Sequence, residues 1–103
     1  MTPEKVLEVI GKYRRFFEIE RIPKVEMLEI FFDMNLSQGH LRKNVLFPHC
    51  HWMLDKIEEF AQEGLLDKAY GWLCFIQGCL LCVGAYTLDE LRNHNRPNDE
   101  TAA

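Results

Sequence analysis

The sequence has little positive charge and no long basic stripe. It holds 12 Lys and Arg against 16 Asp and Glu, for a formal net charge of −4 at pH 7. Proteins that bind nucleic acid owe much of that affinity to cations that neutralise phosphates, so nucleic acid is not expected as the main partner. The first nine residues, MTPEKVLEV, also lack the apolar core and cleavage site of a signal peptide. We therefore expect a cytoplasmic protein.

The chain also lacks internal repeats, and it is too short for two hydrophobic cores. Of its 103 residues, 48% are hydrophobic and 12% are aromatic. Such a composition is typical of a globular protein and excludes a disordered one. We expect a single domain over residues 1–96 and a disordered polar tail over residues 97–103.

One stretch, residues 65–86, is almost free of polar side chains. After Lys68 no charged residue occurs for twenty positions. A helix that is apolar on all sides is normally buried in a protein core or in a bilayer. We expect this helix to be the centre of a bundle. Its small residues should meet another helix closely, and they fall on one stripe: Gly71, Cys74, Gly78, Cys82 and Ala85.

The same stretch is long enough to be considered as a transmembrane helix. Asp67 and Asp89 flank it, however, so it has no positive-inside signal, and Gln77 lies at its midpoint. The other predicted helices each have an apolar face that needs a partner. These features favour a helix bundle in water over a membrane span.

Helical periodicity recurs in the remaining sequence, with recognisable start and stop residues. Thr2 and Pro3 are typical of a helix start, and Gly64 is typical of a helix end. Thr87 and Glu90 have the spacing of a capping box. The pattern predicts an all-α fold, a small bundle of four main helices plus a short C-terminal helix. The predicted helices span residues 3–20, 23–34, 48–63, 65–86 and 87–95.

The triplet His49-Cys50-His51 suggests a metal site, because Cys and His are the usual ligands of zinc. Cys79 and Cys82, one helical turn apart, would complete it. On a helix, however, His49 and His51 point roughly 160° apart. The alternative is a histidine at the core edge, a surface histidine at position 51, and cysteines that serve packing. We expect no metal and no cofactor.

Acidic residues suggest two enzymatic alternatives. His51 and Asp55 have the spacing of a general base and the carboxylate that orients it, although no nucleophile accompanies them. The pairs Glu26/Glu29 and Asp55/Glu58 are similar to the magnesium-binding acids of all-α nucleotide pyrophosphohydrolases. A solvated outer face explains these acids as well, and we expect a protein that is not an enzyme.

Three other residues are candidates for binding. Trp52 falls among polar residues and could anchor an interface. Alternatively, its ring lies over the Lys56 side chain or is covered by residues 35–47, which form a short helical turn or an irregular arm. Gln77 needs hydrogen-bond partners if it is buried, in an interhelical network or in a ligand pocket. Phe16 belongs to a wide apolar face that a second molecule could cover.

The C-terminal half resembles a set of short, uncharacterised proteins of bacteriophages and bacteria. The similar segments are HCHWMLD (49–55), KAYGWLCFIQG (68–78) and LDELRNHNRP (88–97). The resemblance implies a phage or bacterial cytoplasmic setting, and it implies no activity.

The sequence thus predicts a small interaction protein that works by binding. Its apolar and aromatic faces exceed what 103 residues easily bury, so we expect a homo-oligomer. A host protein or a small nucleotide-like ligand is the expected further partner. The alternatives are a pyrophosphohydrolase-like or nucleotide-sequestering protein, and a Cys/His metal-binding protein. The expected binding residues are Phe16, His49, His51, Trp52, Asp55 and Gln77.

Overall fold

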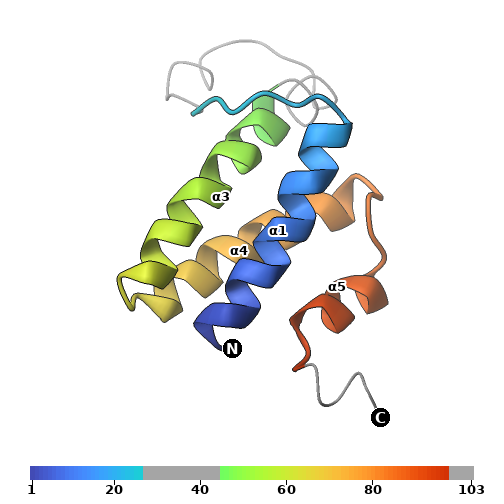
Figure 1. The fold of residues 1–103 in the computed structure, drawn as a ribbon. Coiled ribbons are helices and arrows are strands. Elements are labelled where there is room, and N and C mark those ends of the chain that lie inside the picture. Colours follow the sequence, from blue (N-terminus) through green and yellow to red (C-terminus); the bar gives the residue numbers. More distant parts are fainter. Residues whose placement is uncertain (27–44, 98–103) are drawn as a thin grey trace.

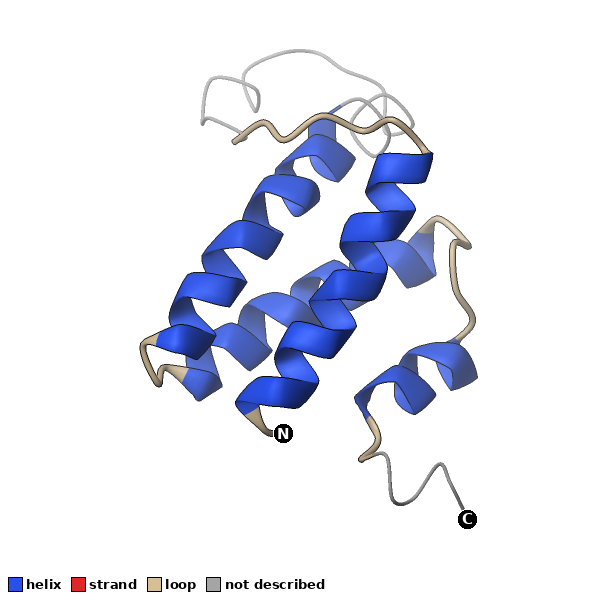
Figure 2. Cartoon of the chain, viewed as in Figure 1, coloured by secondary structure: helices blue, strands red, loops and turns tan. Residues whose placement is uncertain are grey.

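The computed structural model describes residues 1–26 and 45–97. Within these two ranges the chain forms four helices and no strand (Figures 1 and 2). The predicted all-α fold class is confirmed. The helices are α1 (Pro3–Ile19), α3 (Phe47–Gln62), α4 (Leu66–Cys82) and α5 (Leu88–Asn95).

Three of the predicted segments lie largely outside the described residues. They are the part of the 23–34 helix beyond residue 26, the 35–47 arm up to residue 44, and the C-terminal tail beyond residue 97. The predicted helix start at Pro23 is wrong, because residues 22–26 have no helical structure. The backbone N–H of Val25 instead donates to the carbonyl of Pro48 at 3.1 Å, so this segment runs from α1 to α3 (Figure 1).

The start and end of α1 follow from local sequence. The Thr2 hydroxyl accepts a hydrogen bond from the Lys5 backbone N–H at 3.1 Å, as expected of an N-cap. At the other end, Ile22 N–H donates to the Phe17 carbonyl at 2.8 Å, which closes the helix. Arg21 lies between them with φ of 58°, a left-handed conformation that usually falls to glycine.

Two glycines end α3 and α4 in the same way. Gly64 (φ 81°) follows α3, and Leu65 N–H donates to the Phe60 carbonyl at 2.8 Å. Gly84 (φ 77°) follows α4, which ends at Cys82 and not at residue 86 as predicted. Glycine adopts positive φ without steric cost, so these positions reverse the chain direction. The sequence prediction identified the first glycine as a stop and missed the second.

The central helix of the described bundle is α3, which packs extensively against both α1 and α4. In Figure 1, α1 and α3 run antiparallel in one layer and α4 crosses behind them. The 65–86 helix was predicted to lie at the centre of the bundle, buried on all sides. Helix α4 contacts α1, α3 and α5, but only one of its sides is buried.

The short helix α5 closes the side of the bundle against α1 and α4. The predicted capping box is confirmed: Glu90 N–H donates to the Thr87 hydroxyl at 3.1 Å, and Thr87 N–H donates to the Glu90 carboxylate at 2.8 Å. Leu91 inserts from α5 into one core shared by all four helices. The largest fully buried side chains of that core are Ile10, Tyr13, Phe17, Leu54, Ile57, Leu73, Ile76 and Leu80.

Candidate functional site

Helix α4 is buried on one side only. Ala69, Leu73, Ile76, Gln77 and Leu80 face the core, although the hydrophobic residues of α4 continue around the helix. On the other side the Phe75 side chain is 48% exposed, and Tyr70 and Leu81 are exposed to a similar degree. We call this exposed side the outer face of α4. It comprises Tyr70, Gly71, Cys74, Phe75, Gly78, Leu81 and Cys82.

The small-residue stripe lies on this outer face, which overturns the prediction that it packs against another helix. A methyl group added to Gly71 or Gly78 would meet no atom within 4 Å. Cys74 and Cys82 are exposed as well. The helical periodicity correctly predicted that these small residues share one side of the helix. The residues of α4 that pack into the core, however, lie on the opposite side.

A shallow groove of about 470 Å³ runs along the outer face. Its lining is almost wholly apolar, and Phe75 and Gly78 form part of its floor. No charged residue occurs on α4 between Lys68 and its C-terminal end. An exposed, uncharged surface of this kind is unusual for a surface that faces only water. The full lining is Leu46, Cys74, Phe75, Gly78, Cys79, Cys82 and Val83.

An aromatic strip joins α3 and α4 beside this groove. The His49 ring stacks on Trp52 with 5.4 Å between centroids, and Trp52 lies 6.5 Å from Trp72. The Lys56 ammonium lies 5.7 Å from the centre of the Trp52 ring. Burial lowers the pKa of His49, so its neutral form is favoured. Trp52 is half-buried, and the lysine side chain covers it as the second interpretation of the sequence predicted.

Gln77 joins three helices through a buried polar network. Its side-chain amide donates to the Tyr13 hydroxyl at 3.0 Å and to the side-chain Oδ1 of Asn95 at 2.7 Å. The Asn95 amide donates back to Gln77 at 3.0 Å, and Tyr13 lies 2.8 Å from Nδ1 of His94. Of the two sequence interpretations of Gln77, an interhelical network is the one that forms.

Tyr13 links His94 to the same network, because its hydroxyl lies 2.8 Å from Nδ1 of His94 and accepts a hydrogen bond from Gln77. When the imidazole is neutral with its proton on Nε2, Nδ1 can accept the proton of the Tyr13 hydroxyl. Burial, assisted by the nearby charge of Lys12, lowers the pKa of His94, which agrees with the neutral form. Burial also raises the pKa of Tyr13 to about 12, so Tyr13 remains a donor.

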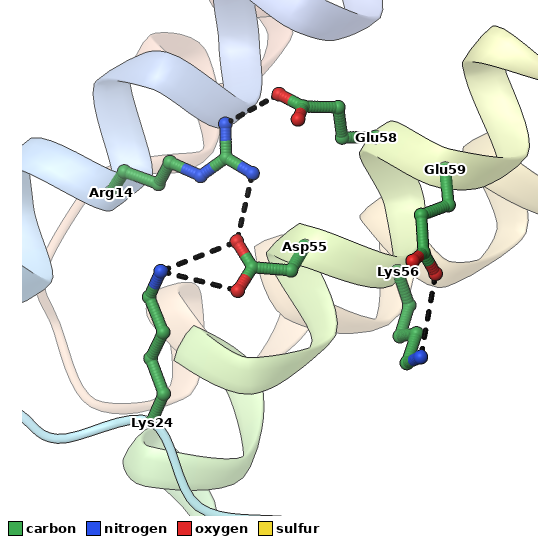
Figure 3. A network of polar contacts seen from close by, with 6 residues as sticks. All are labelled: Arg14, Lys24, Asp55, Lys56, Glu58 and Glu59. Atoms are coloured by element: carbon green, nitrogen blue, oxygen red, sulfur yellow. Dashed lines mark hydrogen bonds and ion pairs between the residues drawn. The ribbon is translucent and has the colours of Figure 1, made fainter.

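Arg14 holds two acids of α3 in an ion-pair network (Figure 3). Its guanidinium donates to Asp55 and to Glu58, each at 2.9 Å, and Lys24 lies 3.1 Å from Asp55. Burial acts to raise the pKa of Asp55, but the hydrogen bonds from Lys24 and Arg14 outweigh it and lower that pKa. The network ties α1 and the segment after it to α3.

These contacts separate His51 from Asp55. His51 is buried, not at the surface as one interpretation predicted, and its ring stacks on Phe17 at 5.2 Å. Its Nδ1 donates to the Ile22 carbonyl at 2.7 Å. Within the described ranges, Nε2 of His51 has no hydrogen-bond partner. The general-base pair suggested by the sequence does not form, because Asp55 points to Arg14 and Lys24.

The acids proposed for magnesium that fall within residues 1–26 and 45–97 are not gathered into one site. Asp55 and Glu58 are paired with Arg14, and Glu26 is exposed. Glu29 lies outside the described residues. Carboxylates that bind a divalent cation normally turn their oxygens toward a shared point, whereas these two turn toward a cation of the protein itself.

The Cys/His set is likewise dispersed. No three His, Cys, Asp or Glu side chains of residues 1–26 and 45–97 lie close enough together to hold a metal ion. His49 and His51 stack on different aromatic rings, and Cys82 is exposed. The neighbouring Cys79 on α4, together with burial, raises the pKa of the buried Cys50 thiol on α3.

Phe16 is half-buried and packs within the protein. Its ring contacts Phe17, Phe47 and Tyr86, with centroids 5.4, 6.2 and 5.9 Å apart. A larger set of exposed apolar residues lies on α4, the helix that was predicted to be at the centre. Exposed Phe75 and Leu81 were therefore missed as binding candidates, since the sequence offered no polar residue to mark that side.

The partners of these candidates were not identified from the sequence. Tyr13 and Asn95 hydrogen-bond to Gln77, His94 hydrogen-bonds to Tyr13, and Arg14 and Lys24 hold Asp55. Their partners lie between 18 and 81 positions away along the chain. The only available signal was Tyr13, a polar-tipped residue within an apolar face.

No known protein family, curated protein or solved structure matches this chain. Among the described residues, no helix combines the length and the apolar character that crossing a membrane requires.

Proposed function

We propose that the protein is a non-enzymatic binding module that self-associates through the outer face of α4. The observation that carries this proposal is an exposed groove of about 470 Å³ with an apolar lining that includes Phe75, which is 48% exposed. Covering that face removes apolar area from water at a gain of roughly 25 cal/mol per Å². Self-association is the simplest way for a small chain to supply such a cover.

A second copy of the chain suits this face because of its lack of charge. A two-fold symmetric interface brings the same patch of both subunits together, so any charge at its centre would meet a like charge. The outer face offers none, since the nearest charges on α4 are Asp67 and Lys68 at its start. Gly78, which has open space above it, would let the partner helix approach the backbone closely.

The aromatic strip of His49, Trp52 and Trp72 is proposed as the surface for a further partner. Trp is among the residues that dominate binding energies, and here its ring is only half-buried. From the resemblance to phage and bacterial proteins, we propose a bacterial cytoplasm as the setting and a host protein as that partner.

Sedimentation velocity across micromolar concentrations tests self-association. The wild type is expected to form dimers, and Phe75→Asp is expected to be monomeric with an unchanged helical circular dichroism spectrum. Leu7→Asp is the matched control, since Leu7 is an exposed apolar residue on α1 and its variant should still dimerise. A monomeric wild type, or a dimeric Phe75→Asp variant, would disprove the proposed interface.

The enzymatic alternative has its own assay. The protein is incubated with nucleoside triphosphates and magnesium, and release of pyrophosphate is measured. We expect no turnover. If the wild type releases pyrophosphate and Asp55→Asn does not, the protein is a pyrophosphohydrolase and the proposal of a non-enzymatic binding module is wrong.

A further inference from the structure

The exposed residues of α4 are centred on Gly78, both around the helix and along it. At about 100° per residue, Phe75 and Leu81 lie roughly 60° to either side of Gly78, one before it in the chain and one after. Their side chains are 48% and 40% exposed. Cys74 and Cys82 are also exposed, and they lie about 40° to either side of Gly78, again one before and one after. Gly78 is therefore the middle of the outer face.

This arrangement is self-complementary under a two-fold rotation. A two-fold axis at Gly78 places each large residue of the face at the level of a large residue of the second copy, and each exposed thiol at the level of an exposed thiol. A methyl group added to Gly78 would meet no atom within 4 Å, so a second backbone has room to approach. The apolar groove of about 470 Å³ includes the same position. These observations favour a second α4, crossing at Gly78, as the cover of this face.

The charge at the start of α4 favours an antiparallel pair of helices. Asp67 is exposed and lies about 20° from Gly78 around the helix, on the same side as the outer face. In a parallel pair Asp67 would lie beside its own copy, and two adjacent like charges repel. The two helix dipoles would also be aligned in the same direction. In an antiparallel pair the two carboxylates lie at opposite ends, beyond the end of the partner helix, because α4 ends at Cys82, one turn after Gly78.

We propose that two copies of the chain pack antiparallel through α4 with the two-fold axis at Gly78, so that Cys74 of each copy faces Cys82 of the other. This inference rests on the proposed self-association and specifies its orientation and register. Closely packed helices have axes roughly 8 Å apart, and their Cα atoms lie about 2.3 Å from each axis. The Cα atoms of Cys74 and the partner's Cys82 are then about 4–6 Å apart, within the range of a disulfide. Each thiol pair needs both copies.

Cross-linking with diamide tests the register. Diamide takes two hydrogens from a pair of adjacent thiols, which become a disulfide while diamide is reduced to the hydrazine. The reduced, full-length protein is treated at a concentration at which sedimentation detects the dimer, with half of the protein labelled with nitrogen-15. The expected product is a covalent dimer in which Cys74 of one chain is linked to Cys82 of the other. Linked peptide pairs with one labelled and one unlabelled member show that the linkage joins two chains.

Two serine variants distinguish the antiparallel pair from a parallel one. Cys74→Ser and Cys82→Ser, each by itself, should lose the covalent dimer, because every expected linkage needs both cysteines. An equimolar mixture of the two variants should regain it, through Cys82 of the first variant and Cys74 of the second. A parallel pair gives the reverse result, since each variant by itself would cross-link through its remaining exposed cysteine. Phe75→Asp, the monomeric control, should remain without cross-links in the same treatment.

Several outcomes would overturn the proposed register. They are linkage of Cys74 to Cys74 or of Cys82 to Cys82, linkage between chains mainly through Cys79, equal cross-linking of Phe75→Asp, or a dimer that diamide does not cross-link. Each of these leaves self-association itself intact, because sedimentation still detects the wild-type dimer. A monomeric wild type, in contrast, disproves both the interface and its register. Circular dichroism spectra verify that the serine variants fold.

Discussion

The two sides of α4 have nearly the same hydrophobicity and opposite environments. Leu73 is fully buried against the core, while Phe75, two residues later, is 48% exposed. Gln77, the one strongly polar residue of α4 after Lys68, lies on the buried side, and Gly78 lies on the exposed side. Polarity therefore did not determine which side is buried.

Shape and partners account for the difference. The buried side offers branched residues of similar size that fit against α3, with Gln77 placed where Tyr13 and Asn95 reach it. The outer face alternates small and large residues, which leaves a groove and not a flat packing surface. A helix that is apolar all round can thus serve the core with one side and remain available for a partner with the other.

The largest expected difference between the sides concerns loss of a single large side chain. Leu73→Ala leaves a cavity in the core and should lower the free energy of unfolding by about 2–5 kcal/mol. Phe75→Ala removes an exposed ring and should change it by no more than about 0.5 kcal/mol. Urea denaturation of both variants in the monomeric state measures this. Equal losses would show that the outer face is covered in solution.

The next effect concerns the one polar residue on the buried side. Gln77→Leu leaves Asn95 without its two hydrogen bonds to that side chain and should destabilise the fold by about 1–3 kcal/mol. Gln62→Leu is the control, because Gln62 is exposed on α3 and its loss should cost little. If the two variants are equally stable, the buried network contributes nothing to stability.

Substitution of two glycines, one on the outer face of α4 and one just after the helix, is expected to have smaller effects on stability. Gly78→Ala adds a methyl group into open space on the outer face and should raise stability by about 0.5–1 kcal/mol, since glycine weakens a helix interior. Gly84→Ala should lower stability by about 1–2 kcal/mol because position 84 has φ of 77°. Thermal unfolding of both variants gives the signs. If Gly78→Ala is instead less stable than the wild type, position 78 lies in the close helix contact that the sequence predicted.

The smallest effect is a pH dependence on the buried side alone. His94 has a lowered pKa when folded, so its neutral form is favoured and its contribution to stability is complete above its unfolded value of about 6.5. That contribution is lost as the pH falls through the folded pKa, because the protonated ring no longer accepts from Tyr13. His94 is half-buried, so the effect is modest.

Melting temperatures at neutral and mildly acidic pH measure this effect, with His94→Gln as the reference. The wild type should lose more stability than the variant over that interval. The same pH response in both proteins would exclude His94 as its source.

Helix existence and most helix ends were predictable from the sequence because their causes are local. The Thr2 cap, the Gly64 stop and the Thr87–Glu90 capping box each involve residues within a few positions of one another. There were two exceptions. Helix α4 ends at Cys82, before Gly84, and not at residue 86. The segment after Pro23 is not helical, and its Val25 N–H bonds to Pro48, a residue distant in sequence.

Tertiary structure alone decided which side of each helix became a site. Hydrophobic periodicity says which residues share a side, and it gives no preference between two apolar sides of α4. That choice came from packing against α3. Packing of α1 against α3 and α4 brought Arg14 to Asp55 and Gln77 to Tyr13, contacts whose partners lie 41 and 64 positions apart along the chain. A sequence pattern extends over one helix, whereas these sites are formed by two or three.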